Sequence, residues 1–102
     1  MTYLDNLAAD IRAAVPADAL PEEDATNLFL SYAVLLLAKG EEVTREDVHN
    51  AWVAWMESRS EEHESMVPFL ELPLGTQGED SPFVLAIRSV ARSMKERNLS
   101  NQ

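Results

Sequence analysis

Hydrophobic residues recur every three or four positions in four stretches of the chain, which is the spacing of one face of a helix. The first stretch covers residues 2–15 and ends at Pro16, because proline cannot continue a helix. The second covers residues 21–39, opens with a proline and three acidic residues, and ends before Gly40. Its centre is apolar on nearly every side, which predicts burial on several sides or a shared interface.

Two further helices are predicted at residues 44–58 and 82–97. Thr44 and Asp47 approximate a capping box at the start of the third helix, and Ser81 with Pro82 supplies a cap and a first-turn proline for the fourth. We expect four side chains on these two helices to be mostly buried: Val48, Trp52, Trp55 and Phe83. The sequence therefore predicts an all-α fold, with residues 1–102 forming a single small four-helix domain.

The connection between the last two helices is unusually apolar. A polar run covers residues 58–64, where the third helix ends or continues in solvent. Residues 66–75 then hold six apolar side chains and two prolines. This content is too hydrophobic for a free linker. We therefore expect an extended loop or single helical turns, packed against the third helix.

The net charge of the chain and its uneven distribution make some classes of binding partner less favourable than others. The 102 residues carry a formal net charge of -10, which disfavours nucleic acids and anionic membranes as partners. Of the 18 acidic residues only Glu96 lies beyond residue 80, whereas four of the eight cations do. Three of these cations, Arg88, Arg92 and Lys95, share one helix face and form a candidate surface for an acidic partner. The alternative is that the basic last helix lies against acidic neighbours within the chain.

Side chains that carry chemistry are few. The chain has no cysteine and two histidines, and no motif for nucleophilic catalysis surrounds any serine. We therefore expect no enzymatic activity and no cofactor. The candidate metal ligands are His49, Glu62, His63 and Glu64, but the two histidines are far apart in sequence and lack an HExxH pattern, so no metal site is predicted. The start of the chain lacks a basic, apolar leader and no apolar run approaches the length of a membrane span, so a cytoplasmic location is expected.

Residues 48–83 resemble the ryanodine-receptor repeat, the small helical RyR domain. The matching residues are His49 and Trp52 on a helix, His63, the segment Met66-Val67-Pro68-Phe69-Leu70-Glu71-Leu72-Pro73, and the acidic pair Glu79-Asp80. The glycine-tryptophan and tyrosine-glycine stretch of that family has no counterpart here. The chain as a whole is also similar to a group of small uncharacterised actinobacterial and phage proteins, for which the resemblance implies no activity.

The resemblance implies a ligand- or partner-binding module, with a nucleotide as the candidate small molecule. We expect a recognition surface between the third helix and the apolar loop, with these residues as candidates: His49, Trp52, His63, Val67, Pro68 and Phe69. The main alternative is a structural or interaction protein that forms a homodimer through the apolar second helix and has no small-molecule ligand. A hydrolase that uses the carboxylates is a third and weaker alternative.

Overall fold

The computed structural model describes residues 2–100, which form helices joined by short turns, with no β-strand in that range. The α-helices are α1 (Tyr3–Ala14), α2 (Thr26–Lys39), α3 (Arg45–Ser58), α4 (Leu74–Gln77) and α5 (Ser81–Ser100). Single 3₁₀ turns connect them, namely η1 (Ala17–Ala19), η2 (Gly40–Glu42), η3 (Phe69–Glu71) and η4 (Gly78–Asp80). The all-α fold class predicted from the sequence is confirmed.

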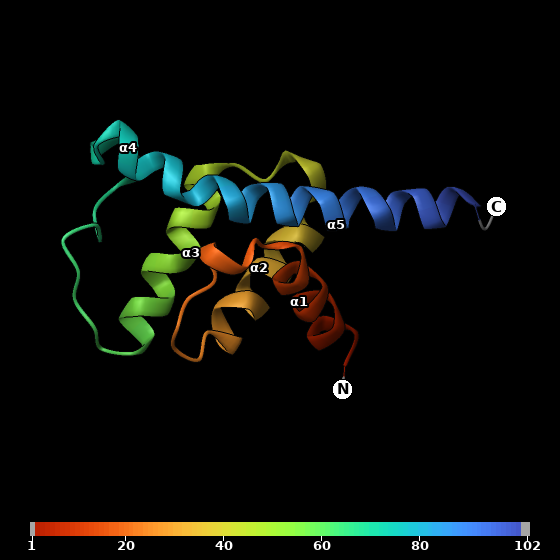
Figure 1. Cartoon of the computed structure of the whole chain (residues 1–102), viewed down its shortest axis with the longest axis horizontal. Coiled ribbons are helices and arrows are strands. Elements are labelled where there is room, and N and C mark those ends of the chain that lie inside the picture. Colours follow the sequence, from red (N-terminus) through yellow and green to blue (C-terminus); the bar gives the residue numbers. More distant parts are fainter. Residues whose placement is uncertain (1, 101–102) are drawn as a thin grey trace.

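Helix α5 is the longest element and runs along the long axis of a body of 47 × 29 × 25 Å (Figure 1). Helices α1, α2 and α3 pack against its N-terminal part, and its C-terminal end extends past them. The core lies where these four helices meet. Its most enclosed large side chains are Ile11, Phe29, Tyr32, Val43, Val48 and Ile87.

Two of the four side chains expected to be mostly buried, Val48 and Trp55, are buried in the core. Trp52 and Phe83 are only half-buried, because both line a cavity at one end of the bundle. Their helical spacing correctly indicated the inward face. It did not reveal that part of this face opens onto a cavity instead of packed side chains.

Local sequence explains most helix boundaries. Capping boxes open α1 and α3, where Thr2 and Thr44 each exchange hydrogen bonds with an aspartate three residues later. The predicted start of the second helix at residue 21 is wrong: α2 begins at Thr26. The Asp24 carboxylate accepts hydrogen bonds from the Thr26 backbone N–H and hydroxyl at 3.0 and 2.7 Å, which forms a turn just before the helix. The N-cap residue is Ala25, so α2 begins five residues later than expected.

The expected cap at Ser81 is also absent from the structure. Ser81 has helical backbone angles, because the turns of α4 and η4 run directly into α5. Its side chain therefore makes no capping hydrogen bond among the described residues.

Helix α3 ends at Ser58 through a Schellman motif. The Ser60 and Glu61 N–H groups donate to the Glu57 and Met56 carbonyls at 3.0 and 3.1 Å. Ser60 occupies the left-handed position of this motif, with φ of 55°, where glycine is usual. The following polar residues leave the helix axis and return toward the bundle as the connecting loop (Figure 1).

The apolar connection packs only in part. Phe69 and Leu72 are buried, whereas Leu70 and Leu74 are 81% and 83% exposed. The expectation that the whole segment would pack is therefore wrong for these two leucines. The single turn of η3 brings residues three apart onto the same side, so Phe69 and Leu72 face the bundle while Leu70 faces solvent.

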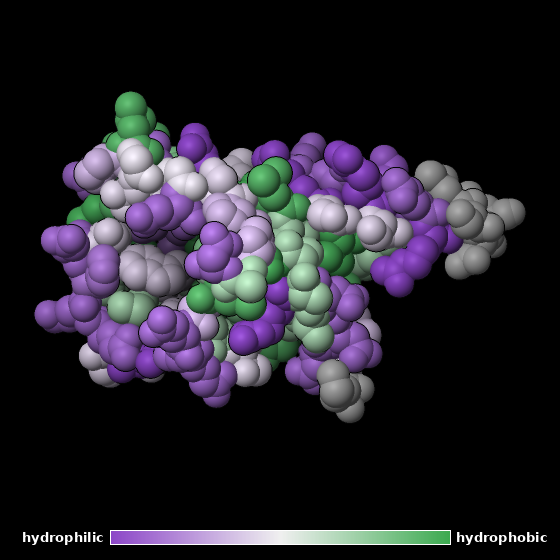
Figure 2. Space-filling model, viewed as in Figure 1, coloured by the Kyte–Doolittle hydropathy of each residue, from purple (hydrophilic) through white to green (hydrophobic). Residues whose placement is uncertain are grey.

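The face shown in Figure 2 is mostly hydrophilic. Its hydrophobic residues appear as separate areas, and hydrophilic side chains cover much of the projecting part of α5. Across the described chain the large exposed hydrophobic side chains are Tyr3, Val34, Leu37, Val67, Leu70, Leu74 and Leu85.

Candidate functional site

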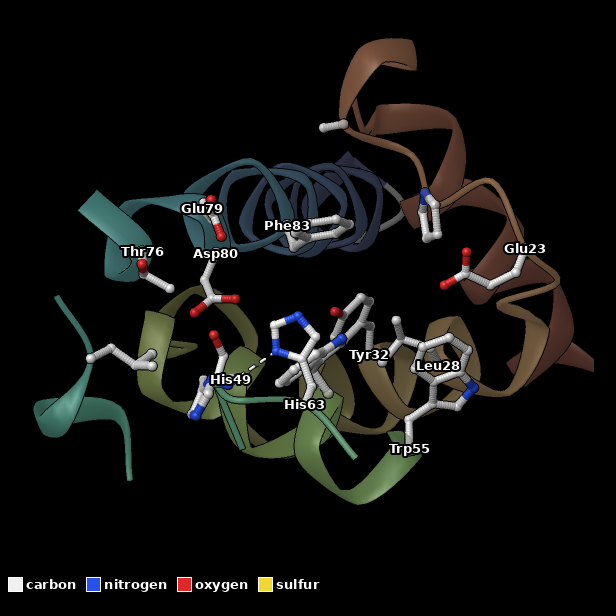
Figure 3. A pocket seen from close by; sticks show the side chains of 15 residues that line it. Glu23, Leu28, Tyr32, His49, Trp55, His63, Thr76, Glu79, Asp80 and Phe83 are labelled. Carbon is white, nitrogen blue, oxygen red and sulfur yellow. Dashed lines mark hydrogen bonds between the residues drawn. The ribbon is translucent and has the colours of Figure 1, made fainter. Parts of the chain in front are cut away.

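A cavity of about 260 Å³ opens where α2, α3 and the start of α5 meet the loops of residues 19–23 and 63–80 (Figure 3). The 15 residues lining it are Ala19, Pro21, Glu23, Leu28, Tyr32, His49, Trp52, Trp55, His63, Ser65, Leu72, Thr76, Glu79, Asp80 and Phe83. Four aromatic rings, two imidazoles and three carboxylates thus come from segments that are distant in sequence. A concave site with apolar walls and a few convergent polar groups is the usual form of a small-molecule site.

His49 lies in the inner wall and is only 3% exposed. Its Nε2 is 2.6 Å from the Val67 carbonyl oxygen. Because a carbonyl can only accept, this nitrogen donates, and Nδ1 of the neutral ring is left as an acceptor. The imidazole stacks beside Trp52 at 5.8 Å between ring centroids and contacts Phe69 at 6.0 Å. His49 therefore joins the loop to α3.

His63 is exposed and lies near the middle of the view in Figure 3. Its Nδ1 accepts a hydrogen bond from the Ser65 backbone N–H at 3.0 Å, which directs Nε2 of the neutral ring to act as a donor. The ring meets Trp52 edge to face, with centroids 5.4 Å apart. The two histidines thus flank the same indole, although 14 residues separate them in the sequence.

Asp80 brings a carboxyl group into the cavity from the end of η4. Burial is the largest cause that raises the pKa of this group, and the net value is about 6 after His49 and Arg45 lower it and the charge of Glu79 raises it. The carboxyl has no hydrogen-bond partner among the described residues. Asp80 is therefore a half-buried acid whose oxygens are available to bind a ligand.

Tyr32 forms the floor of the cavity from α2, with its ring 5.5 Å from Phe29 and 5.6 Å from Phe83. The residue is 1% exposed, and burial raises the pKa of its phenol well above the ordinary value. Its hydroxyl has no hydrogen-bond partner among the described residues. Because no side-chain polar atom of that part of the chain is both enclosed and unpartnered, this hydroxyl opens into the cavity.

Three of the six ligand-binding candidates, His49, Trp52 and His63, line this cavity. The other three, Val67, Pro68 and Phe69, are not part of the lining. The Val67 carbonyl accepts the His49 hydrogen bond, exposed Pro68 precedes the η3 turn, and buried Phe69 packs against the far side of the imidazole. Their place in the structure is to hold a wall of the cavity in position.

The three cations proposed as a partner surface differ in their surroundings. Arg88 is half-buried and its Nε donates to the Val43 carbonyl at 2.9 Å. The Arg92 Nε donates to the Glu41 carboxylate at 3.0 Å. Lys95 is exposed. Two of the three cations therefore bind groups within the chain, as the intramolecular interpretation of the charge asymmetry implies.

Twelve of the 15 lining residues were not among the sequence candidates for the site, and they include Glu23, Tyr32, Glu79, Asp80 and Phe83. One of them carries a usable signal in the sequence, since a tyrosine inside a helix that is apolar on all sides must place its hydroxyl somewhere polar. The position of Glu23 depends on the late start of α2. Its carboxylate reaches the cavity because residues 21–24 form a loop instead of a helical turn.

Residues 2–100 show neither a metal-binding cluster nor a membrane-spanning helix. Within that range no group of three or more histidine, aspartate or glutamate side chains is arranged to hold a metal ion. None of its helices combines the length and the hydrophobicity needed to cross a lipid bilayer. The cavity is the candidate site because it gathers histidines, carboxylates and aromatic rings in one place.

Comparison with known proteins identifies a family without a described activity. No curated protein and no solved structure matches the chain. The profile of a domain of unknown function, DUF7701, matches residues 2–92, a range that includes α1 to α4, the whole lining of the cavity and the first half of α5. The chain belongs to the DUF7701 family.

Proposed function

We propose that this chain is a non-enzymatic binding module whose ligand site is the cavity between α2, α3, η4 and the start of α5. The observation that carries the proposal is Tyr32. A side chain that is 1% exposed directs a hydroxyl with no partner in the described structure into a cavity lined by aromatic rings. A polar group in such a place costs stability unless something fills its hydrogen bonds, and a ligand does this selectively.

The RyR-like residues support the same location. His49 and Trp52 line the cavity, and the Val67-Pro68-Phe69 turn holds His49 in place through the hydrogen bond to Val67. A planar group can stack on Trp52 while its edge meets the histidine and Tyr32. The resemblance to the ryanodine-receptor repeat is thus a proposal for how these residues are used, with a nucleotide as its candidate ligand.

The size and charge of the cavity limit that candidate. At about 260 Å³ the cavity is smaller than the roughly 300–1,000 Å³ of sites for drug-sized molecules. Among the 15 described residues that line it there is no lysine or arginine to pair with a phosphate. A nucleotide would therefore enclose its base here and leave its phosphates in solvent.

A matched pair of hydroxyl deletions tests the proposed site. Tyr32→Phe removes the hydroxyl in the cavity, whereas Tyr3→Phe removes one from a side chain that is 69% exposed on α1. A thermal-shift panel of adenosine, ATP, an aliphatic diamine and divalent metals should contain a compound that raises the melting temperature of the wild type and of Tyr3→Phe. The same compound should have a clearly smaller effect on Tyr32→Phe. Equal shifts in both variants would place the site elsewhere.

The second candidate function is homodimerisation through α2. The observation that favours it is the exposure of Val34 and Leu37, at 54% and 47%, on a helix whose composition is apolar nearly all round. Sedimentation of the wild type, of Val34→Ser with Leu37→Ser, and of Leu85→Ser separates the cases, since Leu85 is 64% exposed on α5. A dimer lost only in the α2 double variant would support this function, and a monomer at micromolar concentration would exclude it.

A further inference from the structure

We propose that the cavity is built for a small organic dication, an aliphatic diammonium ion whose two charged ends bind carboxylates at opposite ends of the site. This inference rests on the proposed function, because it names the ligand class of the same cavity. It is carried by the charge of the lining, the placement of the carboxylates and the nature of the walls between them.

Apart from two histidines, the ionisable side chains that line the cavity are all acidic. Glu23, Glu79 and Asp80 contribute carboxylates, and none of the 15 described lining residues is a lysine or arginine. None of the three carboxylates forms an ion pair or hydrogen bond with another described side chain. Two side chains lower the pKa of Asp80, namely His49 in the lining and Arg45, which lies outside the lining with its guanidinium 5.7 Å from the centre of the Phe69 ring. A cationic ligand would supply the charge that the cavity lacks.

The carboxylates stand at two ends. Figure 3 shows Glu79 and Asp80 together on one side of the cavity and Glu23 on the opposite side, extending from the loop before α2. A monocation could meet only one of these ends at a time. A dication with a short spacer reaches both ends, and the second contact then forms at a high effective concentration.

Between the two ends the walls are aromatic and apolar. The ring centroids of Tyr32 and Phe83 lie 5.6 Å apart, and both rings occupy the middle of the view in Figure 3. Trp52 also lines the cavity and meets the His63 ring edge to face. Methylene groups pack well against such rings, and ring faces also attract ammonium groups. A polar spacer, or a hydrated inorganic dication, would not make these favourable contacts with the aromatic rings.

Tyr32 is the independent observation that points to a ligand. Its side chain is buried to 1% exposure, and its oxygen points toward the middle of the cavity, on the side of Asp80 (Figure 3). The oxygen can accept a hydrogen bond from an ammonium N–H, while carboxylates accept the others. The ammonium group needs three acceptors, and this end of the cavity offers Tyr32, Asp80 and Glu79.

Calorimetric titration at pH 8 with three ligands that share a four-carbon chain tests the inference. The expected order of affinity is 1,4-diaminobutane, then n-butylamine, with no binding of 1,4-butanediol. The diamine should bind about five- to tenfold tighter than the monoamine, which is the order of one additional ordinary hydrogen bond, because the Glu23 carboxylate is exposed to solvent. Equal affinity of diamine and monoamine would contradict the two-ended site, and binding of the diol would contradict the requirement for charge.

Two neighbouring glutamates supply a matched pair of variants. Glu23→Gln neutralises the lining carboxylate and should reduce the diamine to the affinity of the monoamine, whereas Glu22→Gln neutralises an exposed residue outside the lining and should change neither affinity. Both residues are exposed, so neither change threatens the fold. An equal loss in both variants would mean that the amines respond only to the net charge of -10 and would overturn the inference.

Failure of this inference and failure of the proposed function give different results. If the amines do not bind but adenosine or ATP stabilises the wild type in a Tyr32-dependent manner, the ligand class is wrong and the binding site stands. If no compound of the panel gives a Tyr32-dependent effect, both fail.

Discussion

Asp80→Asn is the substitution that most directly tests the electrostatics of the cavity. The Asp80 carboxyl is half-buried, and no described side chain donates a hydrogen bond to it. Asparagine has nearly the same shape and resembles the protonated acid. The substitution therefore removes the negative charge and leaves the packing of η4 against α3 intact.

The magnitude follows from the pKa of this group. Burial raises it from 3.8 to about 6, so the folded state binds a proton more tightly than the unfolded state does. The charged form thus lowers the stability of the fold. The loss begins as pH rises above the unfolded value of 3.8 and is complete above about pH 6. At about 1.4 kcal/mol per pKa unit the upper limit is about 3 kcal/mol. Partial exposure to solvent reduces this to about 1–2 kcal/mol.

Urea denaturation at pH 4 and pH 7.5 measures this effect. Asp80→Asn should equal the wild type in stability at pH 4 and exceed it by about 1–2 kcal/mol at pH 7.5. The control is Asp18→Asn, which makes the same chemical change at an exposed position and should show no such difference between the two pH values. A variant that is less stable than the wild type at pH 7.5, or a difference that does not change with pH, would show that the charge of Asp80 does not destabilise the fold.

Four further predictions concern the fold. Trp55→Ala should lower the free energy of unfolding by about 3–5 kcal/mol, because the indole is buried and the Arg59 guanidinium carbon lies 4.5 Å from the centre of its ring. A loss below about 1 kcal/mol in chemical denaturation would place this side chain outside the core. His49→Ala should cost about 2–4 kcal/mol through lost packing and the lost hydrogen bond to Val67, and an unchanged denaturation midpoint would contradict this. Ser60→Gly should stabilise the chain by about 1 kcal/mol by relieving the left-handed backbone strain, and a decrease would show that no strain exists. Residues 66–75 should resist proteolysis under native conditions, and rapid cleavage there would mean that the segment does not pack.

Helical periodicity was sufficient to predict the all-α class because its signals are local. The capping boxes at Thr2 and Thr44 depend on residues three positions apart, and both α1 and α3 begin where such a pair places them. The start of α2 was misplaced because the acidic run after Pro21 suits either a helix N-terminus or a capping loop. The hydrogen bonds of Asp24 to Thr26 decide between them, and they are a property of the folded loop.

The site was predictable only in part, for a related reason. His49, Trp52 and His63 all fall within the stretch of residues 48–83 that resembles a known motif, and they were found through that resemblance. Glu23 and Tyr32 reach the same cavity from the other side of the bundle, and their approach depends on how α2 packs against α3 and α5. No local sequence pattern predicts how these helices pack against one another. A buried tyrosine in an apolar helix was the single signal that could have placed one of them at a polar site.

The central claim is that a small molecule binds in the cavity, and the two tryptophans of the chain report on it directly, since Trp52 and Trp55 both line the cavity. In proton–nitrogen correlation spectra at pH 8, titration with 1,4-diaminobutane should shift both indole N–H signals saturably while the amides of exposed Tyr3 and Asn6 on α1 stay in place. Adenosine and ATP, titrated in the same way, cover the other ligand class. Indole signals that remain unchanged with all three compounds, or shifts confined to Val34 and Leu37 on α2, would contradict a ligand site in this cavity.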